Sequence, residues 1–516
     1  MKFKEKLALL MTATGLSNST LARALSLDPS LISRWRTGTR VPSQNSPRIE
    51  ALAQYFASLA KTDYRKAALC GVLGVPPEKS PLLDKAALAE MLYAWLSSGA
   101  APDPALIDGL MGRLEAACAV PRSPAPFHPA PTETEPVPPG GTAVFYGTEG
   151  KRSAARKFLC SVLAQNRPAT SFLYSEESMN WMTGDGEFLQ KLFSLLYEVL
   201  ARGHLIKIVH VLNRGLSELL AAIEFWLPLY LTGRIEPYYC PRYRDHYFRR
   251  TVFAAPGAAV VSCALAGHED LAVTHFCTDP KTADFLTREF GAFLNSMCRP
   301  LVRIFTGSRP PGLEEFLAEF YEKPGDYIYT AGQLSPLTMP EEVFSSLLER
   351  SGLAGDSKEK TFSEWHRKRK AFFKGLERGS FIEISSLPSP EEVAAGLARA
   401  DLGCIWAGAP VYYRPQEYSC HLQNIARLLQ SHEGFLFVAS RRALWQNVRL
   451  LVKDGAGAVA VKTSQPPAVF TFSQPNMVNA FYCYLEDAVG GLPPKEKDRT
   501  RTAAALLELS EKLRCP

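Results

Sequence analysis

The first strong pattern of apolar positions lies close to the N-terminus. Ser17 can cap a helix, because its hydroxyl accepts hydrogen bonds from the free amides of the first turn. The residues after it place Leu21, Ala22 and Leu25 on one face at helical spacing. The pattern therefore predicts a short helix over about 18–25.

A second helix follows almost at once. Asp28 and Pro29 form a strong start signal, since the carboxylate caps the first turn and proline lacks an amide that this position leaves unpaired. Gly38 is a good left-handed terminator, so a helix is expected over about 29–37. Its faces differ in character, with Ile32 and Trp35 or Arg36 on the apolar side and Pro29, Ser30, Ser33 and Arg34 on the polar side.

Two short helices joined by a tight turn form a helix-turn-helix, whose second helix can enter the major groove of DNA. The string resembles the Cro/C1-type (XRE) family of repressors over about the first 60 residues. The chain departs from that family at Ser26, where glycine is usual and a strained positive φ costs about 1 kcal/mol. It also carries Arg36 where an acidic residue is common. The matching positions are Leu16, Ser17, Leu21, Ala22, Leu25, Ser30, Ile32, Ser33, Trp35, Gly38 and Pro42.

The resemblance implies a double-stranded operator as partner, bound by a homodimer on palindromic half-sites. The net charge of the chain is +6, and residues 1–50 alone carry eight Lys or Arg against three acidic residues. This basic footprint suits phosphate neutralisation by the N-terminal segment. The DNA-contacting residues that the resemblance implies are Asn18, Pro29, Ser30, Ser33, Arg34, Arg36, Thr39 and Arg40.

The rest of the chain is too long for one ordinary core, so several domains are expected. The segment 80–119 is periodic and either helps two copies pair or packs onto the head. Eight prolines between 120 and 142 predict an extended, semi-stiff linker. The expected segments are a DNA-binding head at 1–74, a helical extension at 80–119, the linker at 120–142, α/β units at 143–307 and 312–494, and a C-terminal helix at 499–516.

The two α/β units are inferred from three matched features in the same order. Each unit reads strand, helix, strand, long helix, strand, helix, strand, hairpin, strand, helix, which predicts mixed sheets with helices on both faces. Coincidence between unrelated α/β segments is the alternative. The matched segments are 200–212 with 376–387, 248–264 with 446–463, and 273–290 with 469–485.

This element order resembles the phospholipase D superfamily, whose signature is His-x-Lys-x4-Asp on the hairpin. Anchoring on the hairpin glycines puts Asn447, Arg449 and Asp454 at the signature places of the second unit. The first unit has Arg249, Thr251 and Pro256 there. Neither has a nucleophilic imidazole, so no phospho-enzyme can form by this route and no enzyme activity is expected. The resemblance, shared with the sensor domains of TrmB-like regulators, implies a pocket for an anionic or small-molecule effector near Arg249, Asn447, Arg449 and Asp454.

Candidate metal chemistry is weak. Cys240, His246, His268, His275 and Cys277 are loosely spaced, so ordinary core residues are the preferred interpretation and no metal or cofactor is expected. Tyr238, Tyr239 and Tyr243 lie near Arg242 and Arg244, and either line a pocket or pack at a strand edge. The 11 cysteines form no C-x-x-C pair, and no signal peptide or membrane span is recognised, which indicates a cytoplasmic protein.

Together these observations predict a multidomain fold: an all-α helix-turn-helix head, a Pro-rich linker and an α/β body of two similar phospholipase D-like units. The expected function is sequence-specific transcriptional regulation with a body for ligand sensing or assembly. The alternative is a phosphodiesterase or nuclease of phospholipase D type that is targeted to DNA.

Overall fold

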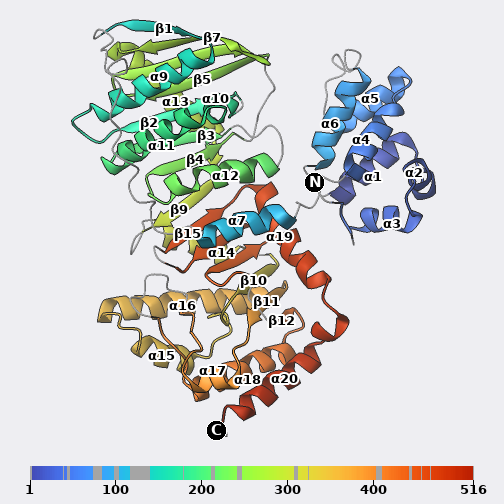
Figure 1. Ribbon diagram of the computed structural model, residues 1–516. Coiled ribbons are helices and arrows are strands. Elements are labelled where there is room, and N and C mark those ends of the chain that lie inside the picture. The colour runs from blue at the N-terminus through green and yellow to red at the C-terminus, as the bar shows by residue number, and fades with distance from the viewer. Residues whose placement is uncertain are drawn as a thin grey trace. The chain divides into compact units, whose positions relative to one another are not determined.

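The structure is a computed structural model of the 516-residue chain (Figure 1). It divides into two compact units, one of Met1–Met111, Arg214–Ala221 and Pro475–Gly491, the other of Gly112–Asn213, Ala222–Gln474 and Leu492–Pro516. The structure describes residues 3–38, 40–42, 47–73, 84–97, 104–116, 140–177, 179–210, 216–240, 247–306, 312–323, 325–402, 410–440, 444–454, 456–464 and 467–514. Most of the expected linker, 120–142, lies outside these residues.

The N-terminal part of the first unit is entirely helical among its described residues. Leu7, Leu52 and Phe56 are fully buried together with Leu92, so the helices up to residue 97 share one hydrophobic core. Lys6 lies at the edge of this core and donates to the carbonyl of Trp95. Burial lowers the pKa of its ammonium group to about 8. The helices are α1 Phe3–Thr14, α2 Asn18–Ala24, α3 Pro29–Thr37, α4 Pro47–Ser58, α5 Asp63–Val72 and α6 Lys85–Ser97, and α7 Pro104–Ala116 follows.

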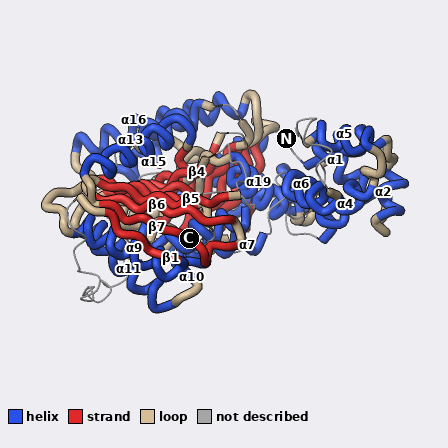
Figure 2. The backbone as a smooth tube through the Cα atoms, turned by 90° about the horizontal axis from the view of Figure 1, so that it is seen from above, coloured by secondary structure: helices blue, strands red, loops and turns tan. Residues whose placement is uncertain are grey.

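The second unit contains two mixed sheets. The first sheet has the order β1-β7-β6-β5-β2-β3-β4-β8. Phe253 packs on Phe158 of α9, whereas the preceding residue, Val252, lies in a cluster with Phe290 of α13. Because neighbouring residues of a strand point to opposite faces, helices cover both faces of this sheet (Figure 2). Its elements are β1 Thr142–Tyr146, α9 Gly147–Leu163, β2 Thr170–Ser175, α10 Asn180–Thr183, α11 Gly186–Ala201, β3 Leu205–His210, α12 Leu216–Tyr230, β4 Ile235–Tyr239, β5 Phe248–Ala255, β6 Ala258–Leu265, β7 His268–Cys277, α13 Pro280–Met297 and β8 Arg299–Pro300.

The second sheet has the order β12-β11-β10-β13-β14-β15-β9. One of its faces packs against α14 and α16 in a large core that includes Phe320, Phe372 and Leu451. Its elements are β9 Val302–Thr306, α14 Leu313–Glu322, β10 Tyr327–Ala331, α15 Glu341–Glu349, α16 Gly355–Leu376, β11 Phe381–Ser386, α17 Pro390–Ala394, α18 Pro415–Ser431, β12 Phe435–Ser440, β13 Val448–Lys453, β14 Gly457–Lys462 and β15 Ala468–Phe472. The chain continues with α19 Pro475–Gly490 and ends with α20 Arg499–Lys512, which packs on α18 through a buried Ser419–Ser510 hydrogen bond of 2.7 Å.

The two sheets share one strand order. In each, three parallel strands (β2, β3, β4 or β10, β11, β12) continue into an antiparallel hairpin (β5–β6 or β13–β14). A further antiparallel strand then pairs with the strand that began the sheet, β7 with β1 or β15 with β9. The prediction of an α/β body with two mixed sheets is confirmed.

Candidate functional site

The local structure of α2 and α3 follows from their caps. The Ser17 hydroxyl accepts from the amide of Thr20, and the Asp28 carboxylate accepts from the amide of Ser30 at 2.7 Å. Gly38 ends α3 in the left-handed conformation with φ 80°. Ser26 holds a φ of 53° in the four-residue connection, the only non-glycine residue with positive φ in the described part of the chain.

The two faces of α3 separate completely. Ile32 and Trp35 have no exposed surface, and the Trp35 ring meets the Phe3 ring edge to face at 6.1 Å. The sequence left open whether Trp35 or Arg36 shares the apolar side with Ile32, and Trp35 is the residue in the core. Arg36 is exposed and donates a hydrogen bond to the Asn18 side chain at 2.9 Å. Thr39 lies outside the described residues. The expected DNA-contacting residues that are exposed are Pro29, Ser30, Ser33, Arg34, Arg36 and Arg40.

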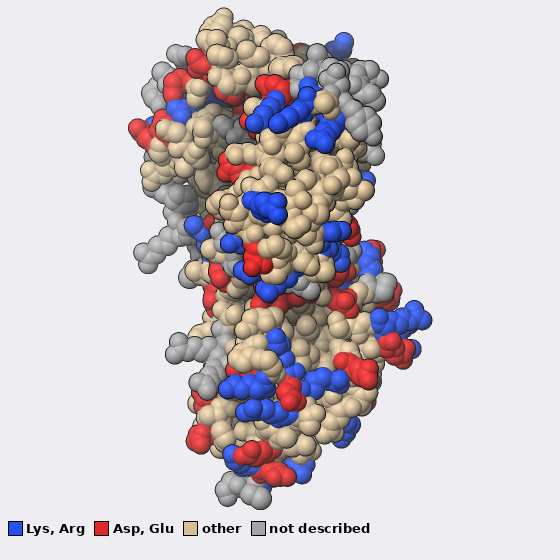
Figure 3. Space-filling model, turned by 90° about the vertical axis from the view of Figure 1, so that its right-hand side faces the viewer, with Lys and Arg blue, Asp and Glu red and all other residues tan. Residues whose placement is uncertain are grey.

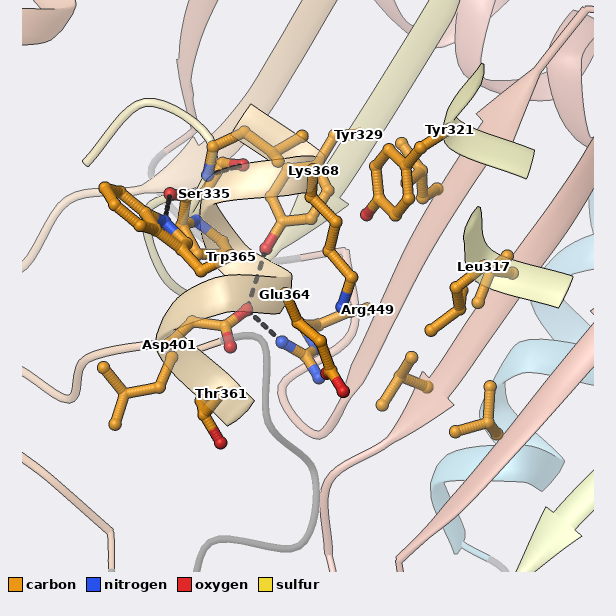
Figure 4. A pocket seen from close by; sticks show the side chains of 17 residues that line it. Leu317, Tyr321, Tyr329, Ser335, Thr361, Glu364, Trp365, Lys368, Asp401 and Arg449 are labelled. Atoms are coloured by element: carbon orange, nitrogen blue, oxygen red, sulfur yellow. Dashed lines mark hydrogen bonds and ion pairs between the residues drawn. The ribbon is translucent and has the colours of Figure 1, made fainter. Parts of the chain in front are cut away.

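A second group of polar side chains lies in a pocket of the second sheet. Arg449 on β13 points toward Asp401, and the two form a buried ion pair (Figure 4). The Tyr329 hydroxyl on β10 donates to the same carboxylate at 3.3 Å. The Nε of Arg449 is buried and has no hydrogen-bond partner among the residues that the structure describes. The pocket has a volume of about 80 Å³, and Tyr321, Glu364, Trp365 and Lys368 also line it.

Beside this pocket lies a fully buried carboxyl group. Glu383 on β11 accepts from the amide of Ser335 at 2.8 Å and from the Thr338 hydroxyl at 3.2 Å. The Thr338 hydroxyl also bonds His421, whose other ring nitrogen bonds Tyr413. Burial raises the pKa of Glu383 to about 7 and lowers the pKa of His421 to about 3. A neutral imidazole and a carboxyl that titrates near neutrality therefore lie in one network.

The first sheet carries a comparable polar group at the end of its central strands. Lys151 on α9 forms a buried ion pair with Glu177, which follows β2. The Thr251 hydroxyl on β5 donates to Glu177 at 3.1 Å and bonds Ser175 at 2.8 Å. In each sheet, therefore, a buried cation is paired with a carboxylate of its own chain.

The structure does not bring the four expected pocket residues together. Arg249 lies on β5, in the other sheet from the remaining three. Asn447 precedes β13, and its backbone amide donates to Glu115. Asp454 lies in the turn after β13 and lines a different hollow. Only Arg449 lines the pocket described above, because five residues of extended strand separate it from Asp454 by roughly 16 Å.

The sequence analysis did not identify Asp401, Glu383 or Lys151 as members of these buried polar groups. Asp401 follows a loop and has no local signal. Glu383 interrupts an apolar strand, and Lys151 lies on the apolar face of a helix. A charged residue at a core position is usually paired, so this pattern could have indicated both buried groups.

The candidate metal ligands form no site in the described part of the chain, where no group of three or more His, Cys, Asp or Glu side chains could hold an ion. His246, Arg242, Tyr243 and Arg244 fall outside that part. None of the described helices is both long and apolar enough to cross a membrane.

Comparison with known proteins gives distant similarities only. No protein-family model and no curated protein matches the chain. Among solved structures, the polyphosphate kinase of Porphyromonas gingivalis is similar over 76% of this chain and 59% of its own, with 10% identity and a TM-score of 0.23. TrmBL2, an archaeal chromatin protein with a novel mode of DNA binding, is similar over 48% of this chain and 92% of its own, with 12% identity and a TM-score of 0.23.

Proposed function

We propose that this chain is a sequence-specific DNA-binding regulator of Cro/C1 type, in which α3 reads an operator. The observation that carries the proposal is the division of α3 into a buried side with Ile32 and Trp35 and a fully exposed polar side. The two buried anchors fix the helix on its domain, so the polar side is presented as a rigid surface. A positioned helix with exposed Ser and Arg side chains is the arrangement that reads base edges in the major groove.

Different side chains take different roles in this proposal. Ser30, Ser33 and Arg34 lie on the exposed side of α3 and contact base edges. Arg36 and Arg40 lie near the end of the helix and contact phosphates. The side chain of Asn18, at the start of α2, holds the Arg36 guanidinium and so orients it.

The test is a pair of substitutions at matched cations. Arg34→Ala is expected to weaken binding to the selected operator by about 1–3 kcal/mol and leave random DNA almost unaffected. Arg40→Ala is expected to weaken both DNAs alike. The operator is first selected from a random library with the full chain, and affinities are measured by fluorescence anisotropy. Equal losses on operator and random DNA in both variants contradict the assignment. Binding as a homodimer is part of the proposal and predicts half-sites one helical turn apart.

The body, in this proposal, is a pair of degenerate phospholipase D-like units that binds an anionic effector or mediates assembly. The shared strand order of the two sheets supports two copies of one unit. Binding rather than hydrolysis is supported by the pocket around Arg449, since its described lining contains no His or Cys that could act as nucleophile. An effector anion there competes with Asp401 for the guanidinium.

Two measurements test the body. A thermal-shift screen with inorganic phosphate and simple phosphate esters should raise the melting temperature, because a ligand that binds only the folded state stabilises it. Asp401→Asn should enlarge that rise by removing the competing charge. Hydrolysis of a generic phosphodiester by the wild type that is lost in Arg449→Ala would instead support the phosphodiesterase alternative.

A further inference from the structure

A hollow lined by basic side chains lies beside the Arg449 pocket and shares Tyr321 and Lys368 with it. It has a volume of about 810 Å³. Its walls are the end of α14, the second half of α16, the start of β10 and the turn after β13. Six cations and three acidic residues line it, and the cations are Lys323, Arg367, Lys368, Lys370, Lys374 and Arg378.

Four of these cations form a stripe along α16 and the turn after it. Arg367, Lys370 and Lys374 follow each other at intervals of three or four residues, which places them on one side of the helix, and Arg378 lies in the turn that follows. All four are exposed, and no ion pair involves them among the described residues. We call these four residues the α16 stripe.

Among the described residues, no ion pair joins an acidic residue of the hollow to the stripe. The Asp326 carboxylate accepts from the amide of Ser380 at 2.7 Å and is committed to that turn. On the face drawn in Figure 3, by contrast, Lys and Arg side chains are interspersed with Asp and Glu, as is usual on protein surfaces. Complementing the negative end of the helix dipole accounts for Lys374 and Arg378, but that effect is confined to the last turn and leaves Arg367 and Lys370 unexplained.

The dimensions of the stripe suit a linear polyanion. From Arg367 to Arg378 the stripe covers eleven residue steps, which measure roughly 16 Å at the helical rise per residue. One strand of B-DNA carries a phosphate every 3.4 Å of helix axis, so about five phosphates fit beside it. The described lining contains no Asn, Gln, Ser or Thr that could pair with base edges, and Lys370 and Lys374 of the stripe are flexible point charges rather than planar forks.

We propose that the α16 stripe binds the phosphate backbone of duplex DNA without reading its sequence. The proposal rests on the DNA-binding function proposed above, and it extends that function by giving the body a second, nonspecific contact. Because head and body belong to one chain, a weak contact of this kind raises the overall affinity through effective concentration.

The test uses the full chain and a duplex of scrambled sequence across a salt series. The logarithm of the binding constant falls with the logarithm of salt concentration by about 0.9 for each phosphate neutralised. Lys370→Gln with Lys374→Gln is therefore expected to reduce the slope by about 1.8. The matched control is Lys191→Gln with Arg288→Gln, which removes two exposed cations that pair within their own helices. Thermal melting of both double variants checks that the fold is intact.

The outcomes separate this proposal from the one for α3. The stripe variant should weaken operator and scrambled DNA by the same factor, so the specificity ratio stays unchanged, whereas Arg34→Ala lowers that ratio. DNA should also protect Lys370 and Lys374 of the wild type from acetylation, measured by mass spectrometry. A slope equal to that of the control variant overturns the proposal. The proposal is also overturned if the stripe variant no longer binds inorganic polyphosphate or anionic vesicles but keeps the wild-type salt dependence of DNA binding.

Discussion

The buried pair of Arg449 and Asp401 allows the most direct test of the body's energetics. Only about a tenth of either side chain is exposed. Removing Asp401 leaves the guanidinium buried in the pocket that Tyr329 and Glu364 also line. Breaking such a pair by removing one partner costs about 3–5 kcal/mol, because the remaining charge is desolvated and uncompensated. Asp401→Ala should therefore lower the stability of the second unit by this amount.

The stability of the single variant is compared with that of the double variant Asp401→Leu with Arg449→Met. Replacing both charges by apolar side chains of similar volume is often neutral or stabilising, so stability should return to near the wild-type value. For a domain of this size, the single variant should lower the melting temperature by on the order of 10 °C. Urea unfolding followed by tryptophan fluorescence, to which Trp365 of the same pocket contributes, measures the stability of both variants, and thermal melting measures the shift in temperature. A single variant that is as stable as the double variant refutes the reasoning, since it shows that water or another group compensates the isolated arginine.

Two further predictions concern a strained turn and a titrating carboxyl. Ser26→Gly should stabilise the head by about 1 kcal/mol, because glycine adopts the positive φ at this position without steric cost, and thermal melting followed by circular dichroism measures the gain. Burial raises the pKa of Glu383 to about 7, above the unfolded value of 4.5, so the folded state binds the extra proton and stability should fall as the pH rises from about 4.5 through 7. Glu383→Gln should flatten this dependence and be more stable than the wild type at pH 8; a wild-type profile that rises with pH over this range contradicts the reasoning.

The sequence located elements best where the signals were local. The bounds of α3, Pro29–Thr37, match the expected helix because Asp28, Pro29 and Gly38 act within one turn of its ends. Positive φ at Ser26 was likewise predictable, since the turn geometry depends on neighbouring residues only. In the body, the alternation of strands and helices predicted an α/β fold with mixed sheets. The pairing of β1 with β7, across more than a hundred residues, is visible only in the structure.

The expected pocket shows why site prediction was harder. Anchoring on a signature assigned Arg449 and Asp454 to one site, but Arg449 lies near the start of β13 and Asp454 lies in the turn after it. The length of an extended strand, about 3.3 Å per residue, could have separated them. No comparable sequence argument points to Asp401, which lies 48 residues before Arg449 and reaches it through the fold.

The buried ion pairs of the two sheets lie in comparable places but are built from different residues. Both lie where the central strands end, and in both the cation meets a carboxylate from its own chain. The pairs are nevertheless built from different positions: Lys151 comes from a helix, whereas Arg449 comes from the hairpin strand, where Thr251 occupies the corresponding place in the first sheet. A polar space at the strand ends therefore accommodates a buried cation at either position, provided that an anion compensates its charge. In each sheet a carboxylate of the chain supplies that anion, so the loss of either carboxylate should destabilise its own sheet.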